Sequence, residues 1–579
     1  MARASSPWTE LSAQLRTSVP ATLGMLFSKV PWLVSLGFVG RIGSTELAAA
    51  ALATSLCNVT GMSLCVGLSS AVTTLTGQAR GQLLASVPTD GAESVDPGEN
   101  TALVDSEAAP AGANYSTEPS PNTNRSTSRK RDQPLLLPLV YLYRGIFIQM
   151  LFVIPVGMWW LTNSTKSVLI FLGQGEELSS MTATYLRILT PGLWSYSINW
   201  TLTAWLQAIE MADLPASAAL IGGILHIPFN LFFIHVLGLG WLGVGVATVL
   251  YQLVQPILMF SYLMTTHHGS SRLLYNLGAK RAGICHLSFW KETRAAISSF
   301  SGIVQYLKLA LPGILAVSEW WASEVAIFMA GKLHPSPEVA LGAMAVYQSL
   351  NATCFMLPIG MSVAGSARIS SCLGAGDPIG ARLAARVCVV TAGCLSMAMG
   401  GILYFSPHDL FPSLFTPDKE LIEMTSRTIP LLSIYVVADG LQTAFHALVK
   451  GCGRQSVLIP IVLIAYWAVG VPLSWHLAFT KHAGDSDCDS EETSFCGVTG
   501  LVGGLTMGTW IHMLLLAATV SLCINWDIEA QSARDRLTIE KRRNKKFGYP
   551  TIDEEISTES IHFNDAGASL RSLASVMSI

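Results

Sequence analysis

Two acidic side chains lie within one apolar stretch of this chain, where ionisable groups are unusual. Glu319 and Glu324 fall between residues 308 and 330, a stretch long enough to cross a bilayer. A charge at the centre of a membrane costs at least ~2.5–3.5 kcal/mol, so an acid at that depth predicts a functional site. A carboxylate can hold a cation when it is ionised and release it when it takes up a proton. The stretch therefore predicts proton or cation chemistry inside the membrane.

The spacing of the two acids places them on different sides of a helix. They are five residues apart, which is about 7.5 Å along a helix axis and about 140° around it. We therefore expect the two carboxylates to meet different surroundings. Trp320 and Trp321 precede Glu324 by four and three residues and should flank it. Their rings can offer cation–π contacts to a substrate or serve only in packing, and both alternatives stay open.

A third acid, Asp439, lies in the apolar segment 427–449. Four polar side chains share its helical face, because they lie four residues before it and three, four and seven residues after it. A polar stripe facing lipid would be expensive, so this one should face a central cavity or a neighbouring helix. A structural hydrogen-bond network is the alternative to a binding role. The four side chains are Tyr435, Gln442, Thr443 and His446.

Three further polar residues lie within apolar segments. Lys29 can pair with an acid of the second half, bind an anionic substrate, or extend its side chain toward the interface. Gln348 and Asn351 are three residues apart, and amides at membrane depth more often join helices than bind ligands. All three are candidates for lining a substrate cavity.

The composition is that of a polytopic membrane protein. The 579 residues include only 13% charged side chains, and the mean hydropathy is +0.46. A bilayer core offers backbone groups no partners outside a helix, so we predict an all-α membrane protein. Twelve apolar segments can each supply the ~20 residues that a span needs. They are 19–40, 47–77, 135–162, 184–209, 215–237, 241–264, 308–332, 339–364, 384–405, 427–449, 457–479 and 499–524.

The two halves of the chain resemble each other. Matching residues recur at an offset of 292 or 293 positions, and each half holds six predicted spans. Because six is an even number, the halves run in the same direction through the membrane. Such a parallel repeat is typical of secondary transporters that alternate access between two lobes. The matching pairs are Pro20 with Pro312, Asn58–Thr60 with Asn351–Thr353, Gly67 with Gly360, and Gly81 with Gly374.

Basic residues predict the orientation and the domains. Of the 35 Lys and Arg residues, 27 lie on the side of both termini, which we therefore expect to be cytoplasmic. The basic run 541–546 predicts a solvated tail near anionic lipid. The expected domains are a cytoplasmic N-terminus (1–18), an N-lobe (19–264) with a disordered insertion (82–133), a cytoplasmic linker (265–306), a C-lobe (308–524) and a cytoplasmic tail (525–579).

The loops carry two candidate modification sites. Cys488 and Cys496 lie in the outer loop 481–497 and can form a disulfide or stay as free thiols. Asn163 begins the one sequon expected on the outer side. The eleven cysteines show no metal-ligand spacing, and the chain has no phosphate-binding loop or nucleophile elbow. We therefore expect no enzyme activity, no ATP-driven transport and no metal site.

The motifs around these residues resemble the eukaryotic branch of the multidrug and toxic compound extrusion (MATE) family. The resemblance covers about residues 10–525, nearly everything except the insertion and the tail. In the second half it is carried by Glu319-Trp-Trp-Ala-Ser-Glu324, Pro358–Arg368, Leu373-Gly-Ala-Gly376 and Lys450-Gly-Cys-Gly453. In the first half it is carried by Phe38-Val-Gly-Arg-Ile-Gly43, Leu52–Ser55, Asn58–Gly61, Gly77-Gln-Ala, Pro191-Gly-Leu and Leu225-His-Ile-Pro228.

The resemblance implies twelve helices in two six-helix lobes that form a V, and export of organic solutes against an inward flux of H⁺ or Na⁺. By motif position, the acids implicated in coupling and substrate binding correspond to Glu319, Glu324 and Asp439. The chain departs from the family at Ser349, at or next to the position of a further acid, and at Thr73, where the family often has an acid. The resemblance therefore does not imply coupling through the first lobe.

These observations predict an antiporter that exports organic cations or secondary metabolites in exchange for protons by alternating access. The alternatives are Na⁺ coupling, export of organic anions, a lipid-linked-glycan flippase, and a channel or transport-dead sensor on the same fold. We expect no cofactor, with H⁺ as the coupling ion and Na⁺ as the alternative. The expected partners are a small organic substrate and the lipid bilayer, without nucleic acid. We expect a monomer in the plasma membrane or a vacuolar-type membrane.

Overall fold

The computed structural model describes residues 6–86, 135–171, 175–280, 289–416, 418–481, 483–485 and 495–546. Within these ranges the chain is helical, and its β-structure is one isolated bridge between His334 and Asp485. Residues 87–133 of the insertion, predicted to be disordered, and residues 547–579 of the tail lie outside the described residues.

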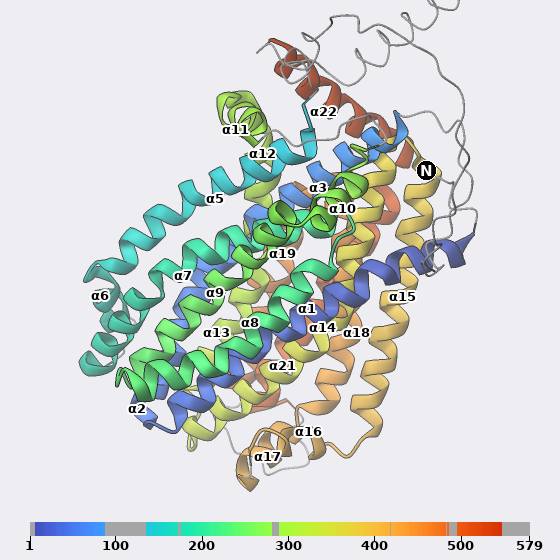
Figure 1. The fold of residues 1–579 in the computed structure, drawn as a ribbon. Coiled ribbons are helices and arrows are strands. Elements are labelled where there is room, and N and C mark those ends of the chain that lie inside the picture. The colour runs from blue at the N-terminus through green and yellow to red at the C-terminus, as the bar shows by residue number, and fades with distance from the viewer. Residues whose placement is uncertain are drawn as a thin grey trace, which may run out of the picture.

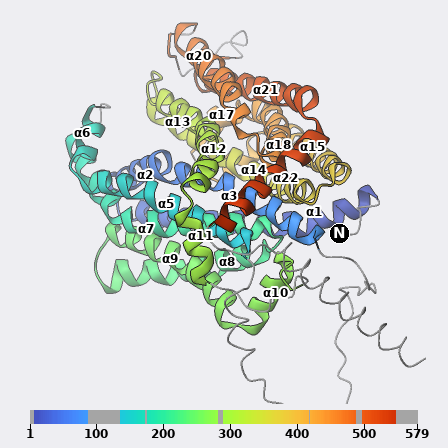
Figure 2. The same ribbon diagram turned by 90° about the horizontal axis from the view of Figure 1, so that it is seen from above.

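Within the described ranges, twelve helical segments are long enough to cross a membrane. Eleven segments of the described chain are long and apolar enough by length and composition alone, and α7 (33 residues) is the twelfth. Each of them contains or overlaps one of the twelve segments expected from the sequence, so the predicted fold class is confirmed. Figure 2 shows the helices of the two halves as two groups.

The N-lobe holds the first six spans. Four of them are single α-helices from end to end, and two contain a π-helical turn. The elements are α1 (Pro7–Gly40), α2 (Ser44–Cys57) with η1 (Asn58–Met62) and α3 (Ser63–Ala85), α5 (Leu137–Leu161), α7 (Glu176–Ala208), α8 (Asp213–Leu231) with η2 (Phe232–Val236), and α9 (Trp241–Thr265). Each of the uninterrupted helices α1, α5, α7 and α9 contains an internal proline.

The C-lobe holds the other six spans. They are α12 (Phe300–Ala316) with α13 (Ser318–Ala330), α14 (Pro337–Ala375), α15 (Pro378–Phe405), α18 (Ile429–Cys452), a composite span, and α21 (Gly497–Cys523). The composite span runs through η3 (Gln455–Val457), α19 (Leu458–Val462), η4 (Leu463–Gly470), α20 (Val471–Trp475) and η5 (His476–Thr480). The shorter or peripheral helices are α6 (Ser164–Phe171), α10 (His267–Leu277), α11 (Phe289–Ser298), α16 (Leu410–Ser413), α17 (Lys419–Ser426) and α22 (Trp526–Lys546).

The internal repeat is visible as a reciprocal contact between α3 and α14. A Cβ atom on Gly81 would overlap the carbonyl oxygen of Ser371, and a Cβ atom on Gly374 would overlap that of Gln78. Gly81 matches Gly374 at the offset of 293, and Gln78 matches Ser371 at the same offset. The contact of Gly81 with Ser371 is therefore equivalent by the repeat to the contact of Gly374 with Gln78. Only glycine allows the two backbones to approach so closely.

A second pair of glycines repeats the pattern nearer the middle of the spans. A Cβ atom on Gly67 would overlap the backbone of Ile314, and a Cβ atom on Gly360 would overlap the side chain of Thr22. Span 2 thus packs on span 7 as span 8 packs on span 1. The predicted repeat accordingly describes the interface between the lobes as well as the lobes themselves.

The lobes are joined on the side where α3, α14 and α18 end. We call this side the terminal face, because the N-terminal end of α1 and the helix α22 also lie there (Figure 1). The hydroxyl of Thr74 on α3 donates to the carbonyl oxygen of Lys450 on α18 at 2.6 Å. The side chain of Gln455 donates to the hydroxyl of Thr74 at 2.9 Å.

Span 7 differs from the continuous helix that the sequence suggested. Its helix begins at Phe300, earlier than expected, and is interrupted at Val317 between α12 and α13. Pro312, which cannot donate a backbone hydrogen bond, lies about one turn before the interruption. Glu319 and Glu324 both belong to α13, so the expected relation between them holds.

The tail also differs from the solvated segment that its basic run predicted. Residues Trp526–Lys546 form α22, and Glu529, Glu540 and Asn544 are buried. Apolar positions such as Ala533 and Leu537 on the same helix are buried as well. The basic residues near the end of α22 predicted a solvated segment, whereas its buried apolar positions form the face that packs on the rest of the protein.

Candidate functional site

The carboxylate of Glu319 lies among polar side chains from other C-lobe helices. The side-chain amide of Gln442 on α18 donates to its Oε2 atom at 2.8 Å. The Nδ1 atom of His512 on α21 lies 3.3 Å from the same oxygen. The Glu319 side chain is only 12% exposed, so its carboxyl group is surrounded by these neighbours rather than by water.

The hydrogen-bonded cluster extends further along α18 and α21 and to the segment η4. The Nε2 atoms of His446 and His512 are 3.2 Å apart. The hydroxyl of Tyr466, in the π-helical segment η4, donates to the Oε1 atom of Gln442 at 3.3 Å and lies 3.0 Å from the hydroxyl of Thr509. π-Helical turns occur frequently at functional sites, and this one places Tyr466 in the cluster.

Sequence reasoning found part of this cluster and missed the rest. Gln442 and His446 were predicted from the stripe around Asp439, whereas Tyr466, Thr509 and His512 were not. His512 lies inside the twelfth predicted span, so a histidine at membrane depth was a signal that could have found it.

Asp439 is buried one turn from this cluster. All five side chains of the predicted stripe, namely Tyr435, Asp439, Gln442, Thr443 and His446, are buried inside the C-lobe. The charges of Asp439 and Glu319 lie close enough to interact electrostatically. The hydroxyl of Thr443 donates to the backbone carbonyl of Asp439 at 2.7 Å and therefore serves the helix itself.

Glu324 points toward the N-lobe instead. The hydroxyl of Ser55 on α2 donates to the Oε2 atom of Glu324 at 2.9 Å. The neighbouring Trp321 donates from its indole nitrogen to the hydroxyl of Ser63 on α3 at 3.3 Å. Ser55 and Ser63 flank the π-helical turn η1. The helix α13 thus has one acid inside the C-lobe and one bonded across the lobes.

The other predicted residues lie apart from these contacts. Trp320 is 38% exposed. Buried amide oxygens of Gln348 and Asn351 have no hydrogen-bond partner among the described residues. Lys29 is exposed, and within the described part of the chain it forms no ion pair with an acid. Of the three alternatives for Lys29, pairing with a C-lobe acid is not seen in this structure.

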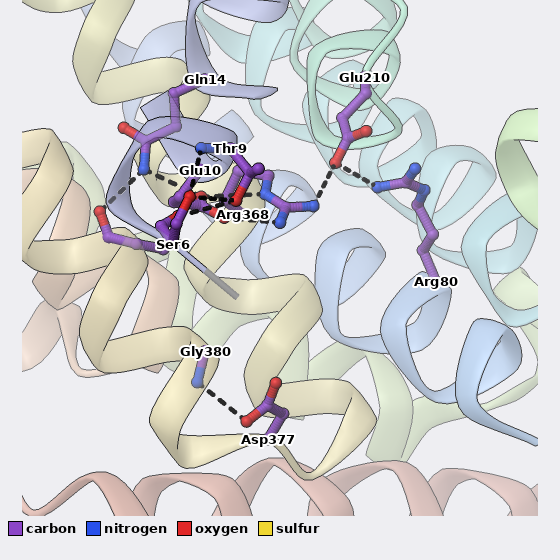
Figure 3. A network of polar contacts seen from close by, with 10 residues as sticks. Ser6, Thr9, Glu10, Gln14, Arg80, Glu210, Arg368, Asp377 and Gly380 are labelled. Atoms are coloured by element: carbon purple, nitrogen blue, oxygen red, sulfur yellow. Dashed lines mark hydrogen bonds and ion pairs between the residues drawn. The ribbon is translucent and has the colours of Figure 1, made fainter. Parts of the chain in front are cut away.

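An ionic network joins the lobes on the terminal face (Figure 3). Arg368 of α14 pairs with Glu10 of α1 at 2.7 Å and with Glu210, between α7 and α8, at 3.5 Å. Arg80 of α3 pairs with the same Glu210 oxygen at 2.8 Å. Gln14, one turn after Glu10, donates to the carbonyl oxygen of Ala384 on α15 at 2.9 Å. One C-lobe guanidinium therefore binds two separate N-lobe segments.

Glu210 has an unusual backbone conformation, and its ion pairs in this network lower its pKa. Its backbone φ of 61° lies in the left-handed region, which costs a residue with a Cβ atom roughly 1–2 kcal/mol. Burial by itself would raise the pKa of Glu210, but the charges and hydrogen bonds of Arg80 and Arg368 lower it to about 2. Glu210 is therefore ionised throughout the physiological pH range.

Two sites on the opposite face concern modification. Asn163, the expected sugar acceptor, is exposed, and its Oδ1 atom accepts a 2.6 Å hydrogen bond from Arg187. Cys496 is disulfide-bonded. Cys488, which the sequence suggested as its partner, lies outside the described residues.

Comparisons with known proteins agree over most of the chain. The MatE family matches residues 20–83, 139–232 and 313–476, more than half of the sequence. Protein DETOXIFICATION 13 of Arabidopsis thaliana is 29% identical over 515 residues, which cover 88% of this chain and 87% of that protein. Multidrug and toxin extrusion protein 1 of Xenopus tropicalis is 28% identical over 478 residues, which cover 82% of this chain and 70% of that protein.

Solved structures share the fold. The eukaryotic MATE transporter AtDTX14 superposes with a TM-score of 0.71 at 24% identity, covering 92% of this chain and 99% of that one. The Vibrio cholerae MATE transporter VcmN, in its bent form, gives a TM-score of 0.62 at 15% identity, covering 92% of this chain and 99% of that one.

Proposed function

The chain belongs to the MATE family of multidrug and toxin extrusion transporters, and from this premise we propose that it exports organic solutes in exchange for protons by alternating access. The proposal assigns the proton to the C-lobe acids Glu319, Glu324 and Asp439. It assigns the terminal face to the cytoplasm of a plasma membrane or vacuolar-type membrane, as the distribution of Lys and Arg predicts.

The hydrogen bond from Ser55 to Glu324 carries this proposal. A hydrogen bond to an ionised carboxylate is roughly twice as strong as one between neutral groups. Proton uptake by Glu324 therefore weakens the link between α13 and the N-lobe. One event at one carboxylate thus changes both the charge offered to a substrate and the free energy that holds the lobes together.

Glu319 and Asp439 supply the second part of the mechanism. They lie in one lobe and close to each other, so we assign the competition between proton and substrate to the two carboxyl groups together. When the pair holds a negative charge it can bind a cationic substrate, and when it takes up a proton it releases that substrate. Because the proton and the cation compete for one site, the two move in opposite directions.

The terminal face supports the alternating-access part. Ion pairs and close glycine contacts join the lobes there, so we propose that this conformation opens toward the opposite face. Return to the other conformation requires Arg368 to leave Glu10 and Glu210. The substrate would leave on the open side, which is the direction of export.

Export of an organic anion is a second candidate. It is favoured by Lys29, whose exposed side chain has no acidic partner among the described residues. An ammonium group free of intramolecular ion pairs can hold a carboxylate of a substrate. The charge of the substrate therefore decides between Lys29 and the C-lobe acids as the binding group.

The test is uptake of a fluorescent organic cation by proteoliposomes under an imposed pH gradient. We expect accumulation that needs the gradient and falls at least tenfold in Glu324→Gln. Glu423→Gln is the matched control, because Glu423 is an exposed acid paired with Arg427 on α17. Accumulation that follows an imposed Na⁺ gradient at constant pH would overturn proton coupling. Uptake of an organic anion that is lost in Lys29→Ala would establish the second candidate.

A further inference from the structure

Three potential metal ligands from three C-lobe spans converge on one point. Glu319 of α13, His446 of α18 and His512 of α21 each offer one ligand atom, and these atoms all lie within 4.8 Å of one another. Both histidines are buried. Individual contacts are closer still, but they use different nitrogens of His512: its Nε2 lies 3.2 Å from His446 Nε2, and its Nδ1 lies 3.3 Å from Glu319 Oε2. One ion would bind only one of these two nitrogens, so the 4.8 Å limit describes the spacing of the site.

These separations are near those within a metal site. Zinc binds histidine nitrogen at ≈ 2.0–2.1 Å and carboxylate oxygen at ≈ 2.0–2.2 Å, so neighbouring ligands of a tetrahedral site are about 3.3–3.5 Å apart. Bringing all three ligand atoms to that spacing from 4.8 Å or less requires side-chain shifts of roughly 1 Å. Rotamer adjustments of this size leave the helices in place.

The present contacts of the two histidines leave hydrogen-bonding capacity unused. The buried Nδ1 atom of His512 makes no hydrogen bond of good geometry among the described residues, although Glu319 is near. Two neutral imidazoles facing each other through Nε2 can share only one hydrogen. A bound cation would engage one nitrogen of each ring and one carboxylate oxygen of Glu319 together.

The surrounding side chains hold these groups in position. Gln442 donates to Glu319 Oε2 at 2.8 Å, and Tyr466 in turn donates to Gln442. The ring of Tyr466 also packs edge-on against the ring of His512, with centroids 5.5 Å apart. Outer contacts of this kind orient the ligands in metal sites and raise affinity.

We propose that Glu319, His446 and His512 form a binding site for a divalent transition-metal ion such as Zn²⁺. Two imidazoles and one carboxylate suit Zn²⁺, Ni²⁺ or Cu²⁺, whereas Mg²⁺ and Ca²⁺ prefer sites made of oxygen atoms. The site leaves a fourth position open, as catalytic and regulatory zinc sites commonly do. The sequence expectation of no metal site rested on cysteine spacing and did not include His512.

Metal binding would also affect transport, and this second step rests on the proposed function. A cation bound to Glu319 occupies a carboxylate that the proposed cycle uses to bind the substrate. Zinc should therefore inhibit transport of an organic cation.

The experiment measures zinc binding to the purified full chain, prepared without a histidine tag, by equilibrium dialysis. We expect one Zn²⁺ per chain, undisturbed by excess Mg²⁺. We expect at least tenfold weaker binding in His446→Gln and in His512→Gln. His226→Gln is the matched control, because His226 is a buried histidine of the N-lobe that contacts Ser35. X-ray absorption at the zinc edge of the wild-type chain should show two imidazole ligands at ~2.0–2.1 Å.

Two outcomes would overturn the site. One is the absence of stoichiometric binding, and the other is binding that both histidine variants retain at wild-type affinity. If the variants fail to fold, the absorption spectrum of the wild-type chain decides alone, and a spectrum without imidazole ligands rejects the proposal. Because binding is measured without transport, a chain that binds zinc but moves no solute would contradict the proposed function and leave this site standing.

Discussion

Ser55 on α2 and Glu324 on α13 are joined by a 2.9 Å hydrogen bond that crosses from one lobe to the other. Five residues earlier on α13, Glu319 is bonded within its own lobe by Gln442. One short helix thus connects the buried polar cluster of the C-lobe to the neighbouring lobe. Changes in charge on α13 are therefore placed to alter the contact between the lobes.

Replacing Ser55 tests this link directly. Ser55→Ala removes a bond to a charged group, which is worth about 1.5–3 kcal/mol and corresponds to a roughly 10- to 150-fold change in an equilibrium. We expect transport to fall about tenfold. The measurement is the initial rate of uptake by proteoliposomes from pH 6 to pH 8.

Thr54→Ala is the control for that experiment. The hydroxyl of Thr54 donates to Ala50 within its own helix, so its loss leaves the contact between the lobes intact. An equal loss of transport in the two variants, at every pH, would show that the Ser55 bond has no special role.

The reciprocal glycines predict a change on the terminal face. Gly81→Ala and Gly374→Ala each place a methyl group on a backbone carbonyl of the opposite lobe, and such overpacking costs about 1–3 kcal/mol. We expect the lobes to separate there. The buried thiol of Cys372 on α14 should then react severalfold faster with a maleimide, as quantified by peptide mass spectrometry.

Gly401→Ala supplies the comparison, because an added Cβ atom on Gly401 would meet nothing within 4 Å. Labelling of Cys372 should stay at the wild-type rate in that variant. If Cys372 is labelled at the wild-type rate in both Gly81→Ala and Gly374→Ala, then α3 and α14 accommodate the added methyl group without separation of the lobes.

The sequence predicted those parts of the molecule that depend on local patterns. The twelve spans follow from apolar length, and the stripe around Asp439 follows from helical spacing, because both are properties of one segment at a time. The partners of Glu319 could not be predicted in this way. Whether His512 or Tyr466 lies beside it depends on how three separate helices are rotated against one another.

Side-chain contacts between the lobes were likewise invisible in the sequence. The repeat matched Gly81 with Gly374 in the sequence. It could not show that Gly81 contacts the helix of Gly374 and that Gly374 contacts the helix of Gly81. Ser55 was part of a recognised motif, but nothing in its neighbourhood indicated that Glu324 would accept its hydrogen bond. The docked helix α22 was not predicted because its few apolar positions, such as Ala533 and Leu537, are outnumbered by charged ones.

The ionic network predicts a pH dependence with a definite sign. Glu210 has a pKa of about 2 in the folded chain against an ordinary value of 4.5. Because the folded-state pKa is the lower one, its contribution to stability is fully present above pH 4.5 and is lost as the pH falls toward 2. Between pH 8 and pH 5 the ion pairs of Glu210 with Arg80 and Arg368 should therefore not respond to protons.

The measurement is the difference in Tm between the wild-type chain and Glu210→Gln in detergent at several pH values. We expect Glu210→Gln to lower Tm by the same amount at pH 8 and at pH 5. A difference that shrinks steadily between these values would show that Glu210 titrates in the working range. It would then compete with the C-lobe acids for the role of coupling group.

The helix α22 predicts the largest effect on stability. Its Glu540 pairs with Arg144 of α5 in the N-lobe at 2.7 Å, with exposed side-chain fractions of 0% and 1%. Its Glu529 pairs at 2.6 Å with Arg454, next to the end of α18 in the C-lobe. Removing one member of a buried pair leaves an uncompensated charge and costs about 3–5 kcal/mol. Arg144→Met should therefore lower Tm strongly, whereas Glu176→Gln, at an exposed pair on the opposite face, should change it little.

The double variant Arg144→Met/Glu540→Leu separates the charge from the docking of α22. Replacing both members by apolar side chains of similar volume removes the desolvation cost along with the attraction. We therefore expect the double variant to regain most of the lost Tm. Failure to regain it, with α22 still protected from protease, would mean that Arg144 acts mainly through its hydrogen bond to the backbone of Ala296. Recovery of Tm together with protection would show that packing, and not the Arg144–Glu540 pair, holds α22 on the terminal face.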